Sequence, residues 1–317
     1  MNVSKLVAAL ATCFIGTVCW GQAPATYQVP ITEYGQPDFQ GVWGTRFSTM
    51  LERPEGAPLV IPAEQQAGFA QIVYERGGLA DNTDPDIDLF GPQTLARVKG
   101  EYRTSVVVYP ENGVLPYNEL GIQKFSYSYF KGDFDFDHPE QRPGVERCIE
   151  SWGSPPMRAF PYQLFHGIVQ TKDKIAIVSE ESVPLRVIHM DGQSRPDAIR
   201  TFEGHSIGHW EGQTLVVETT HYSDTNPARA TINRLMLISA EARVTERFTR
   251  VSESELFYEY TVDDPVYYTE PWRGEFSFTR EDRSHIYEYS CHEGNYSMVG
   301  ALRGARAEKA FAAKGNN

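Results

Sequence analysis

The residues richest in chemistry lie between positions 204 and 224, in the stretch GHSIGHWEGQTLVVETTHYSD. Its three histidines are His205, His209 and His221. They surround a run, TLVVETT, whose β-branched residues and alternation are typical of a strand. An imidazole titrates near neutrality, so His205 could give and take a proton, with the nearby Glu203 as an orienting partner. The alternative is a histidine at the end of a hairpin that is hydrogen-bonded to water.

A metal site built from these histidines is a further alternative. Residues four apart on a strand lie on one face, about 13 Å apart, which is too far for His205 and His209 to share an ion. Sharing would require the chain to bend at its two glycines, or His221 or His292 to fold against the pair. The sequence also lacks a phosphate-binding glycine loop, a dinucleotide fingerprint, a nucleophile elbow and an HExxH motif. We therefore predict neither a metal nor an organic cofactor.

Arg158 follows a stretch rich in Pro and Gly, from 130 to 161, that predicts a long irregular loop. Long ordered loops often carry function, and an acidic, solvated loop is the alternative. A guanidinium at the mouth of a barrel could hold a carboxylate, an enolate or a carbonyl oxygen. Equally, Arg158 could fasten the loop by donating to backbone carbonyls.

Charged residues on expected strands are further candidates. Glu180, Arg186 and Glu218 could line the interior of a barrel, although paired charges inside a small barrel are also a structural device. The residues that we assign to catalysis are His205, Arg158, Glu203 and Glu218. The residues that we assign to substrate binding are His166, Arg186, Trp210, His292 and Tyr296.

The N-terminus predicts export. One lysine precedes an apolar run from Leu6 to Trp20, and small residues follow at positions where a signal peptidase could cut. The run is short for a membrane span, so we predict a signal peptide over 1–23, a periplasmic or secreted protein, and no membrane insertion. The formal net charge of −13, without a basic tract, argues against a nucleic-acid partner.

Export determines how the four cysteines are interpreted. Cys13 and Cys19 would leave with the signal peptide, so Cys148 and Cys291 remain. Two thiols in an oxidising compartment favour one disulfide, which would contribute about 4–5 kcal/mol in the chain-entropy model. Two separate buried thiols are the alternative. We reject a nucleophilic pair of Cys291 and His292, because adjacent side chains on a strand point to opposite faces.

The pattern along the chain predicts a mainly β protein. A polar arm over 24–40 precedes a first strand at 41–47, and residues 62–77 predict a short helix with Pro at its start and Gly at its end. After Tyr162, short alternating strands follow one another across Gly, Asp and Ser turns. The Asp191-Gly192 turn is among the expected hairpins, and a last pair of strands is expected in the run from 275 to 291.

An antiparallel meander of eight or more strands usually closes, since closure removes its exposed edges. We therefore predict one lipocalin-like barrel domain over 41–307 with long loops, and a flexible tail over 308–317. A β-sandwich is the alternative.

Several motifs also resemble, in their order, those of a family of secreted bacterial proteins that mostly lack an assigned function. They are RTSVVVYP (103–110), ERCI (146–149), PYQLFHGIVQT (161–171), WEGQTLVVETT (210–220), ERFTR (246–250), TVDDP (261–265) and EYSCHEGNY (288–296). The resemblance implies export and a predominantly β, barrel-like fold, and it supplies no reaction. In the family pattern the positions of His205 and His209 vary. The two histidines are therefore either catalytic residues of a subgroup of the family or surface residues that are free to vary.

These features together predict an exported barrel whose aromatic interior takes a small, largely apolar molecule. His205, a carboxylate and Arg158 would then perform acid/base chemistry without a cofactor: an elimination, an isomerisation or a cyclisation. One competing hypothesis is a periplasmic carrier of apolar molecules without chemistry. The other is a metal-dependent hydrolase, in which His205 or His209 meets a further histidine in space.

Overall fold

A computed structural model of the chain describes residues 27–76, 94–126, 137–142, 144, 147–160, 163–180, 185–225, 228–231, 234–282 and 284–315. The predicted signal peptide over 1–23 and the beginning of the predicted loop at 130–161 lie outside these ranges.

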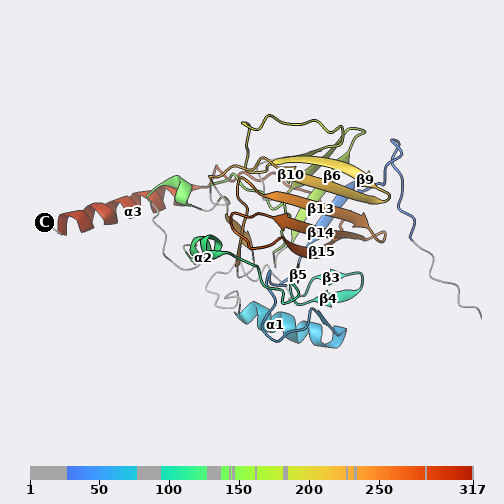
Figure 1. Cartoon of the computed structure of the whole chain (residues 1–317), viewed down its shortest axis with the longest axis horizontal. Helices are drawn as coiled ribbons and strands as arrows, with labels where there is room; N and C mark the ends of the chain where they lie inside the picture. Colours follow the sequence, from blue (N-terminus) through green and yellow to red (C-terminus); the bar gives the residue numbers. More distant parts are fainter. Residues whose placement is uncertain are drawn as a thin grey trace, which may run out of the picture.

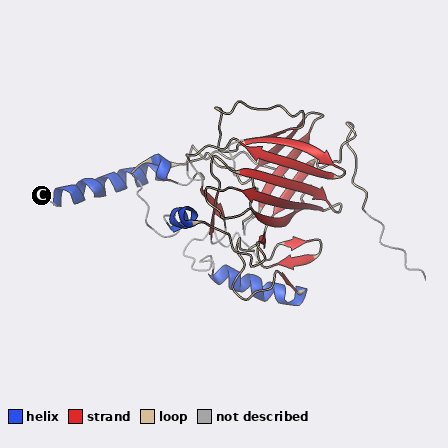
Figure 2. Cartoon of the chain, in the orientation of Figure 1, coloured by secondary structure: helices blue, strands red, loops and turns tan. Residues whose placement is uncertain are grey.

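Nine strands close into a barrel (Figures 1 and 2). In their order around the barrel they are β1 (Gly41–Thr45), β6 (Leu164–Gln170), β7 (Lys174–Ser179), β8 (Arg186–His189), β9 (His205–Glu211), β10 (Thr214–Thr220), β13 (Arg243–Arg250), β14 (Glu255–Asp263) and β15 (Trp272–Arg280). The pairing of β15 with β1, in which Arg280 lies opposite Trp43, closes the barrel. A tenth strand, β5 (Val107–Tyr109), pairs with the first part of β15. The closed barrel confirms the predicted fold class.

The pairing of β8 with β9 is parallel, whereas the other neighbouring strands of the barrel are antiparallel. The prediction of a hairpin at Asp191-Gly192 was therefore wrong. Parallel neighbours need a crossover connection, and the residues between His189 and His205 provide it. Asp191 opens this crossover with a local turn, in which its Oδ1 accepts from the backbone N–H of Gln193 at 3.1 Å.

The interior of the barrel is built by alternation along each strand. On β13, Val244, Glu246, Phe248 and Arg250 are buried, and the residues between them are partly exposed. The inward-facing side chains from β1, β13, β14 and β15 form one aromatic core. Its rings are those of Trp43, Phe248, Tyr258, Tyr260, Trp272, Phe276 and Phe278. Neighbouring rings such as Phe248 and Tyr258 lie 4.8 Å apart between centroids, within the range of favourable aromatic pairs.

An irregular segment, residues 149–160, packs against the barrel interior, where Met157 lines a small void together with Trp43 and His166, and we call it the plug. All residues from 150 to 159 are buried, so the predicted alternative of a solvated loop was wrong for this part. Burial requires partners for the backbone polar groups. The Met157 N–H donates to the Tyr258 hydroxyl at 2.8 Å, and the Ser151 carbonyl accepts from Arg158 at 2.7 Å.

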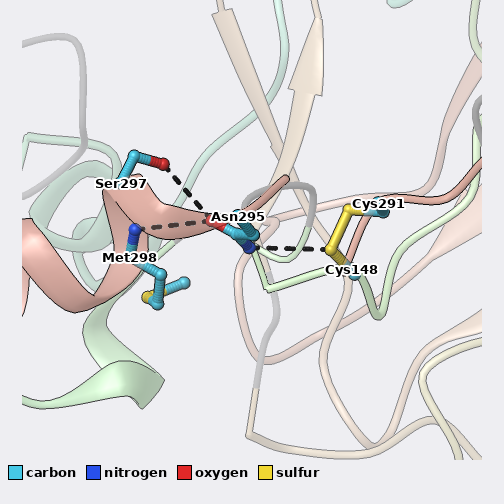
Figure 3. The surroundings of a disulfide bond; sticks show 5 residues. All are labelled: Cys148, Cys291, Asn295, Ser297 and Met298. Carbon is cyan, nitrogen blue, oxygen red and sulfur yellow. Dashed lines mark hydrogen bonds between the residues drawn. A yellow bond between two sulfur atoms is a disulfide. The ribbon is translucent and has the colours of Figure 1, made fainter. Parts of the chain in front are cut away.

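Cys148, directly before the plug, forms a disulfide with Cys291 (Figure 3). The predicted disulfide is therefore present. The bond links the plug to the segment that leads into the last helix, and Asn295 donates to the Cys148 sulfur at 3.6 Å.

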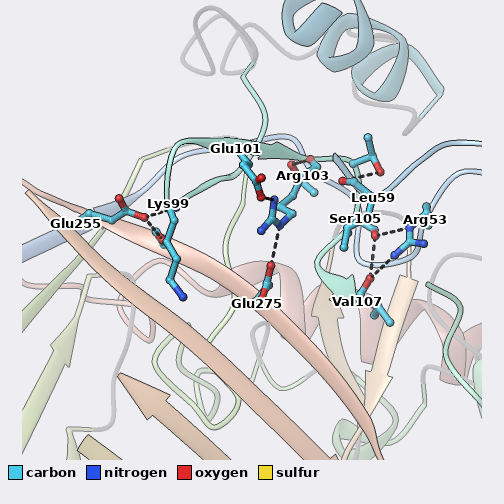
Figure 4. Close-up of polar contacts among 12 residues, drawn as sticks. Arg53, Leu59, Lys99, Glu101, Arg103, Ser105, Val107, Glu255 and Glu275 are labelled. Carbon is cyan, nitrogen blue, oxygen red and sulfur yellow. Dashed lines mark hydrogen bonds and ion pairs between the residues drawn. The ribbon is translucent and has the colours of Figure 1, made fainter. Parts of the chain in front are cut away.

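A small layer lies along one side of the barrel (Figure 1). Its sheet consists of β2 (Val60–Ile61), β4 (Glu101–Arg103) and β3 (Arg97–Val98), and the helix beside it is α1 (Gln66–Arg76), preceded by a 3-10 turn at Ala63–Gln65. The predicted short helix is thus confirmed. Arg103 fastens the layer to the barrel wall, since its Nε donates to Glu275 on β15 at 2.7 Å (Figure 4).

Three further short elements complete the described structure. They are α2 (Glu119–Ser126), a 3-10 turn at Pro139–Gln141 and a separate hairpin of β11 (Ala228–Thr231) and β12 (Arg234–Leu237).

A helix, α3 (Tyr296–Gly315), extends away from the barrel (Figure 1) and crosses the predicted domain end at residue 307. Residues 284–290 before it form no strand, so the predicted last hairpin was wrong. The alanine-rich composition of α3 favours a helix, but small residues carry little of the apolar periodicity that marks one in a sequence. None of the helices in the described ranges is long and apolar enough to cross a membrane.

Candidate functional site

Arginine and glutamate side chains form a network between the plug and the barrel wall, which we call the Arg–Glu network; all are buried except Glu203, which is partly buried. Its members are Glu150, Arg158, Arg186, Glu203, Arg229 and Glu246. Three of the predicted site residues, Arg158, Arg186 and Glu203, therefore belong to one constellation. A sequence alone could not show this, because the members come from five separate segments.

Arg158 lies within the plug and forms an ion pair with Glu150, with both side chains almost fully buried. Its guanidinium also lies 5.0 Å from the ring of Trp152, a distance suited to a cation–π contact. Burial lowers the pKa of Arg158, and the charge of Glu150 opposes this shift. These contacts fit the interpretation that Arg158 fastens the loop.

Arg186 on β8 and Glu246 on β13 form the second buried ion pair. Arg186 Nη1 donates to Glu246 Oε1 at 3.0 Å, and the Tyr258 hydroxyl donates to the same oxygen at 2.8 Å. Burial raises the pKa of Tyr258 well above its usual value, so this hydroxyl keeps its proton. The same hydroxyl accepts from the plug at Met157, so the pair joins the barrel wall to the plug.

Glu203 has one carboxylate oxygen with a hydrogen bond and one without, among the described residues. Its Oε1 accepts from the Ser154 hydroxyl at 2.6 Å, whereas its Oε2 is shielded from solvent and has no hydrogen-bond partner among the described residues. Burial raises the pKa of Glu203, and Ser154 and Arg229 oppose the shift. The hydroxyl of the fully buried Tyr222, whose pKa burial also raises, likewise lacks a partner within the described ranges. A carboxyl group in such surroundings can act as an acid.

His205 lies outside this network. Ser206 beside it faces the interior and bonds Arg186, whereas His205 faces the outer side of β9 and lies under the crossover. Its Nε2–H donates to the Gln193 carbonyl at 2.7 Å. The rings of His189 and His221 lie 4.8 and 6.1 Å from its own ring, between centroids.

These histidines do not assemble a metal site. His209 is exposed and lies 3.3 Å from Glu211, and His221 lies 3.2 Å from Asp197. Among the residues that the structure describes, no group of three His, Cys, Asp or Glu side chains could hold a metal ion.

His166, a predicted substrate-binding residue, faces the barrel interior. It is 1% exposed, and its Nδ1 lies 2.7 Å from the Ser179 hydroxyl. Burial lowers the pKa of His166 to about 3, so the ring is neutral near pH 7. Its Nε2 has no hydrogen-bond partner in the described part of the chain.

The remaining predicted site residues lie elsewhere. Glu218 is half-exposed on the outer wall and pairs with Arg243, so the prediction that it lines the interior was wrong. His292 and Tyr296 are exposed around the start of α3. Trp210 is partly buried and packs edge-on against Phe39, with ring centroids 5.2 Å apart.

The voids that the described residues enclose beside the plug are small. Two voids beside Met157 measure about 20 and 10 Å³, which is close to the space that one water molecule needs. The predicted interior pocket for an apolar molecule stays a prediction.

A much larger cleft of about 660 Å³ lies outside the barrel, and we call it the outer cleft. Its lining residues are Met50, Glu52, Arg53, Pro54, Glu55, Gly56, Ala57, Asn112, Val114 and Arg234. They come from the loop before β2, the turn after β5, and β12. The volume falls in the usual range of small-molecule sites. No sequence motif marked these residues, because the cleft depends on how three distant segments come together.

No family model, curated protein or solved structure matches this chain. The resemblance of its motifs to a family of secreted bacterial proteins stays a prediction.

Proposed function

We propose that the protein is an exported binding protein that takes a small molecule in the outer cleft. The observation that carries the proposal is the contrast in volume between the outer cleft, about 660 Å³, and the voids of about 20 and 10 Å³ in the barrel. Apolar side chains, including Met50 and Val114, line the outer cleft beside charged ones, as expected for a site that both buries and orients a ligand. The disulfide supports the export part of the proposal, since such bonds persist in oxidising compartments.

Filling the outer cleft tests the proposal. Val114→Trp places a bulky side chain in the cleft, and Val178→Trp is a matched control, because Val114 and Val178 are 42% and 41% exposed and Val178 lies on the barrel wall. Native mass spectrometry of the gently purified protein should find an organic adduct on the wild type and on Val178→Trp. Val114→Trp should lack it. A wild type without an adduct, or an adduct that Val114→Trp retains, would overturn the proposal.

A second candidate function is cofactor-independent acid/base catalysis, an elimination, isomerisation or cyclisation, at the Arg–Glu network. The observation that favours it is the shielded, unpaired Oε2 of Glu203 together with the raised pKa of this carboxyl. Shifted pKa values of this kind are enriched at catalytic sites, although structural networks produce them too. Glu203 would give the proton, and the neighbouring charge of Arg229 would stabilise the carboxylate that remains.

Glu203→Gln tests this second function, because the amide keeps the shape of the side chain and cannot supply the proton. Conversion of the ligand identified above by the wild type, and its loss in a folded Glu203→Gln, would support catalysis. Equal conversion by both proteins, or conversion by neither, would rule it out.

A further inference from the structure

We infer that the outer cleft selects a small zwitterion with an ammonium and a carboxylate group at one end of an apolar body, as in an apolar α-amino acid. This inference names the ligand class of the proposed binding function and rests on it. It follows from which charged side chains of the cleft are neutralised by a partner within the chain and which are not.

Arg234 and Glu52 neutralise each other at one wall of the outer cleft. Arg234 Nε donates to Glu52, whose side chain is 12% exposed. Glu52 Oε1 also accepts from the backbone N–H of Leu115 at 2.9 Å. A ligand that bound either side chain through its charge would compete with this ion pair. The pair therefore shapes the cleft and does not determine the charge of the ligand.

Arg53 carries a positive charge that no carboxylate in the described ranges neutralises. Its Nη1 donates to the Glu111 carbonyl at 2.6 Å. Its Nε donates to the Ser105 hydroxyl at 3.3 Å and its Nη2 to the Val107 carbonyl at 3.4 Å (Figure 4). These three acceptors are neutral, so they hold the guanidinium in place without compensating its charge. Each terminal nitrogen keeps one further N–H that can donate to a ligand carboxylate.

Glu55 supplies a negative charge to the same cleft. It occupies the second position of a turn that the hydrogen bond from the Ala57 N–H to the Pro54 carbonyl closes at 3.0 Å. Gly56 at the third position has a φ of 76°, as a type II turn requires there. The turn leaves Glu55 exposed, and among the described residues its carboxylate has neither an ion pair nor a side-chain hydrogen bond. It can accept from a ligand ammonium group.

Arg53 and Glu55 make no ion pair with each other, although only Pro54 separates them in the chain. Two residues span at most about 7 Å of backbone, so the two charges approach a ligand from neighbouring positions. A head group that carries both charges can place its carboxylate against Arg53 and its ammonium against Glu55. An apolar body can then cover lining side chains such as Met50 and Val114.

Three ligands that share one apolar tail test the inference by calorimetric titration of the full mature protein. They are norleucine, pentylamine, which lacks its carboxylate, and hexanoate, which lacks its ammonium. Salt at about 0.15 M screens the field of the net charge of −13, so the comparison at pH 7 reports on contacts in the cleft. We expect norleucine to bind about two- to fivefold more tightly than either of the others, as one added charge contact at a partly exposed site allows.

Two substitutions assign the two contacts. Glu55→Gln should bring norleucine to within about twofold of hexanoate, because the amide offers no charge to the ammonium. Arg53→Gln should bring norleucine to within about twofold of pentylamine, and its unfolding temperature shows whether the fold is kept. Glu253→Gln is the matched control, since it removes an exposed glutamate on the turn between β13 and β14, outside the cleft lining. It should keep both preferences.

Norleucine that binds no more tightly than pentylamine or hexanoate would overturn the zwitterion inference, and so would a Glu55→Gln variant that keeps the preference over hexanoate. Loss of binding in Val114→Trp would in those cases still uphold the binding function. Failure of all three ligands to bind would overturn the inference, and the adduct in native mass spectrometry would then decide the binding function separately. Binding that Val114→Trp leaves unchanged would overturn both.

Discussion

Arg186 and Glu246 face each other across the interior of the barrel, with Arg186 Nη1 donating to Glu246 Oε1 at 3.0 Å and both side chains withdrawn from solvent. The Tyr258 hydroxyl donates to the same carboxylate and accepts from the plug at Met157. The pair therefore determines how the plug is held, and its loss should affect the whole fold.

Removing one partner of this pair should be costly. Glu246→Gln leaves the Arg186 charge buried without its counter-ion, and we expect the free energy of unfolding to fall by about 3–5 kcal/mol. The surface pair of Glu218 and Arg243 supplies the control, because Glu218→Gln should cost at most about 1 kcal/mol. Urea denaturation followed by tryptophan fluorescence measures both. Similar losses of unfolding free energy in the two variants would show that the buried pair stabilises the fold no more than the surface pair does.

His166 should make the protein acid-sensitive. Burial lowers its pKa to about 3 in the folded chain, whereas an unfolded histidine titrates near 6.5. The unfolded state takes up the proton first, so stability is complete above about pH 6.5 and falls as the pH drops toward about 3. The full difference corresponds to at most about 5 kcal/mol.

His166→Gln, which does not titrate, should flatten the dependence of the unfolding free energy on pH between about 6.5 and 3. His138→Gln is the control, because His138 is 59% exposed and the shape of the curve should not depend on it. Parallel curves for the wild type and His166→Gln would exclude His166 as the source of acid sensitivity.

Local pattern was enough to predict most of the barrel strands. The turn at Glu211-Gly212 joins β9 to β10 as expected, because both strands alternate and their partners are neighbours in sequence. The parallel pairing of β8 with β9 was not accessible in this way. An Asp-Gly turn has the same local chemistry whether it closes a hairpin or opens a crossover, and the choice depends on the packing of distant strands.

The candidate sites could not be predicted from local sequence for the same reason: they are formed by segments that are distant in the chain. The sequence indicated Arg158 and Glu203 as single candidate residues. The plug that covers them is held by Tyr258 and Arg186, which are far away in sequence. Glu218 lies on a predicted strand, yet the register of β10 against β13 turns it outward. The outer cleft forms only where three distant segments meet, and it leaves no sequence signature.

The disulfide should stabilise the fold by anchoring the plug. The bonded cysteines are 143 residues apart, and a loop of that length is worth about 4–5 kcal/mol in the chain-entropy model. The double variant Cys148→Ser/Cys291→Ser should lose about that much unfolding free energy, and the wild type in reductant should approach it. An effect below about 1 kcal/mol would mean that the plug needs no anchor.

His205→Ala distinguishes a role in the crossover from a role in the proposed sites. The substitution leaves the Gln193 carbonyl without its imidazole donor, so we expect a loss of about 1–3 kcal/mol of unfolding free energy. Backbone amides in the crossover, between His189 and His205, should exchange hydrogen faster, whereas ligand binding in the outer cleft should not change. His209→Ala is the control, because His209 is exposed on the same strand and its loss should cost at most about 0.5 kcal/mol. The opposite result would be loss of ligand binding or turnover in His205→Ala with unchanged hydrogen exchange in the crossover. It would identify His205 as a functional residue, because the fold of the crossover would then be intact.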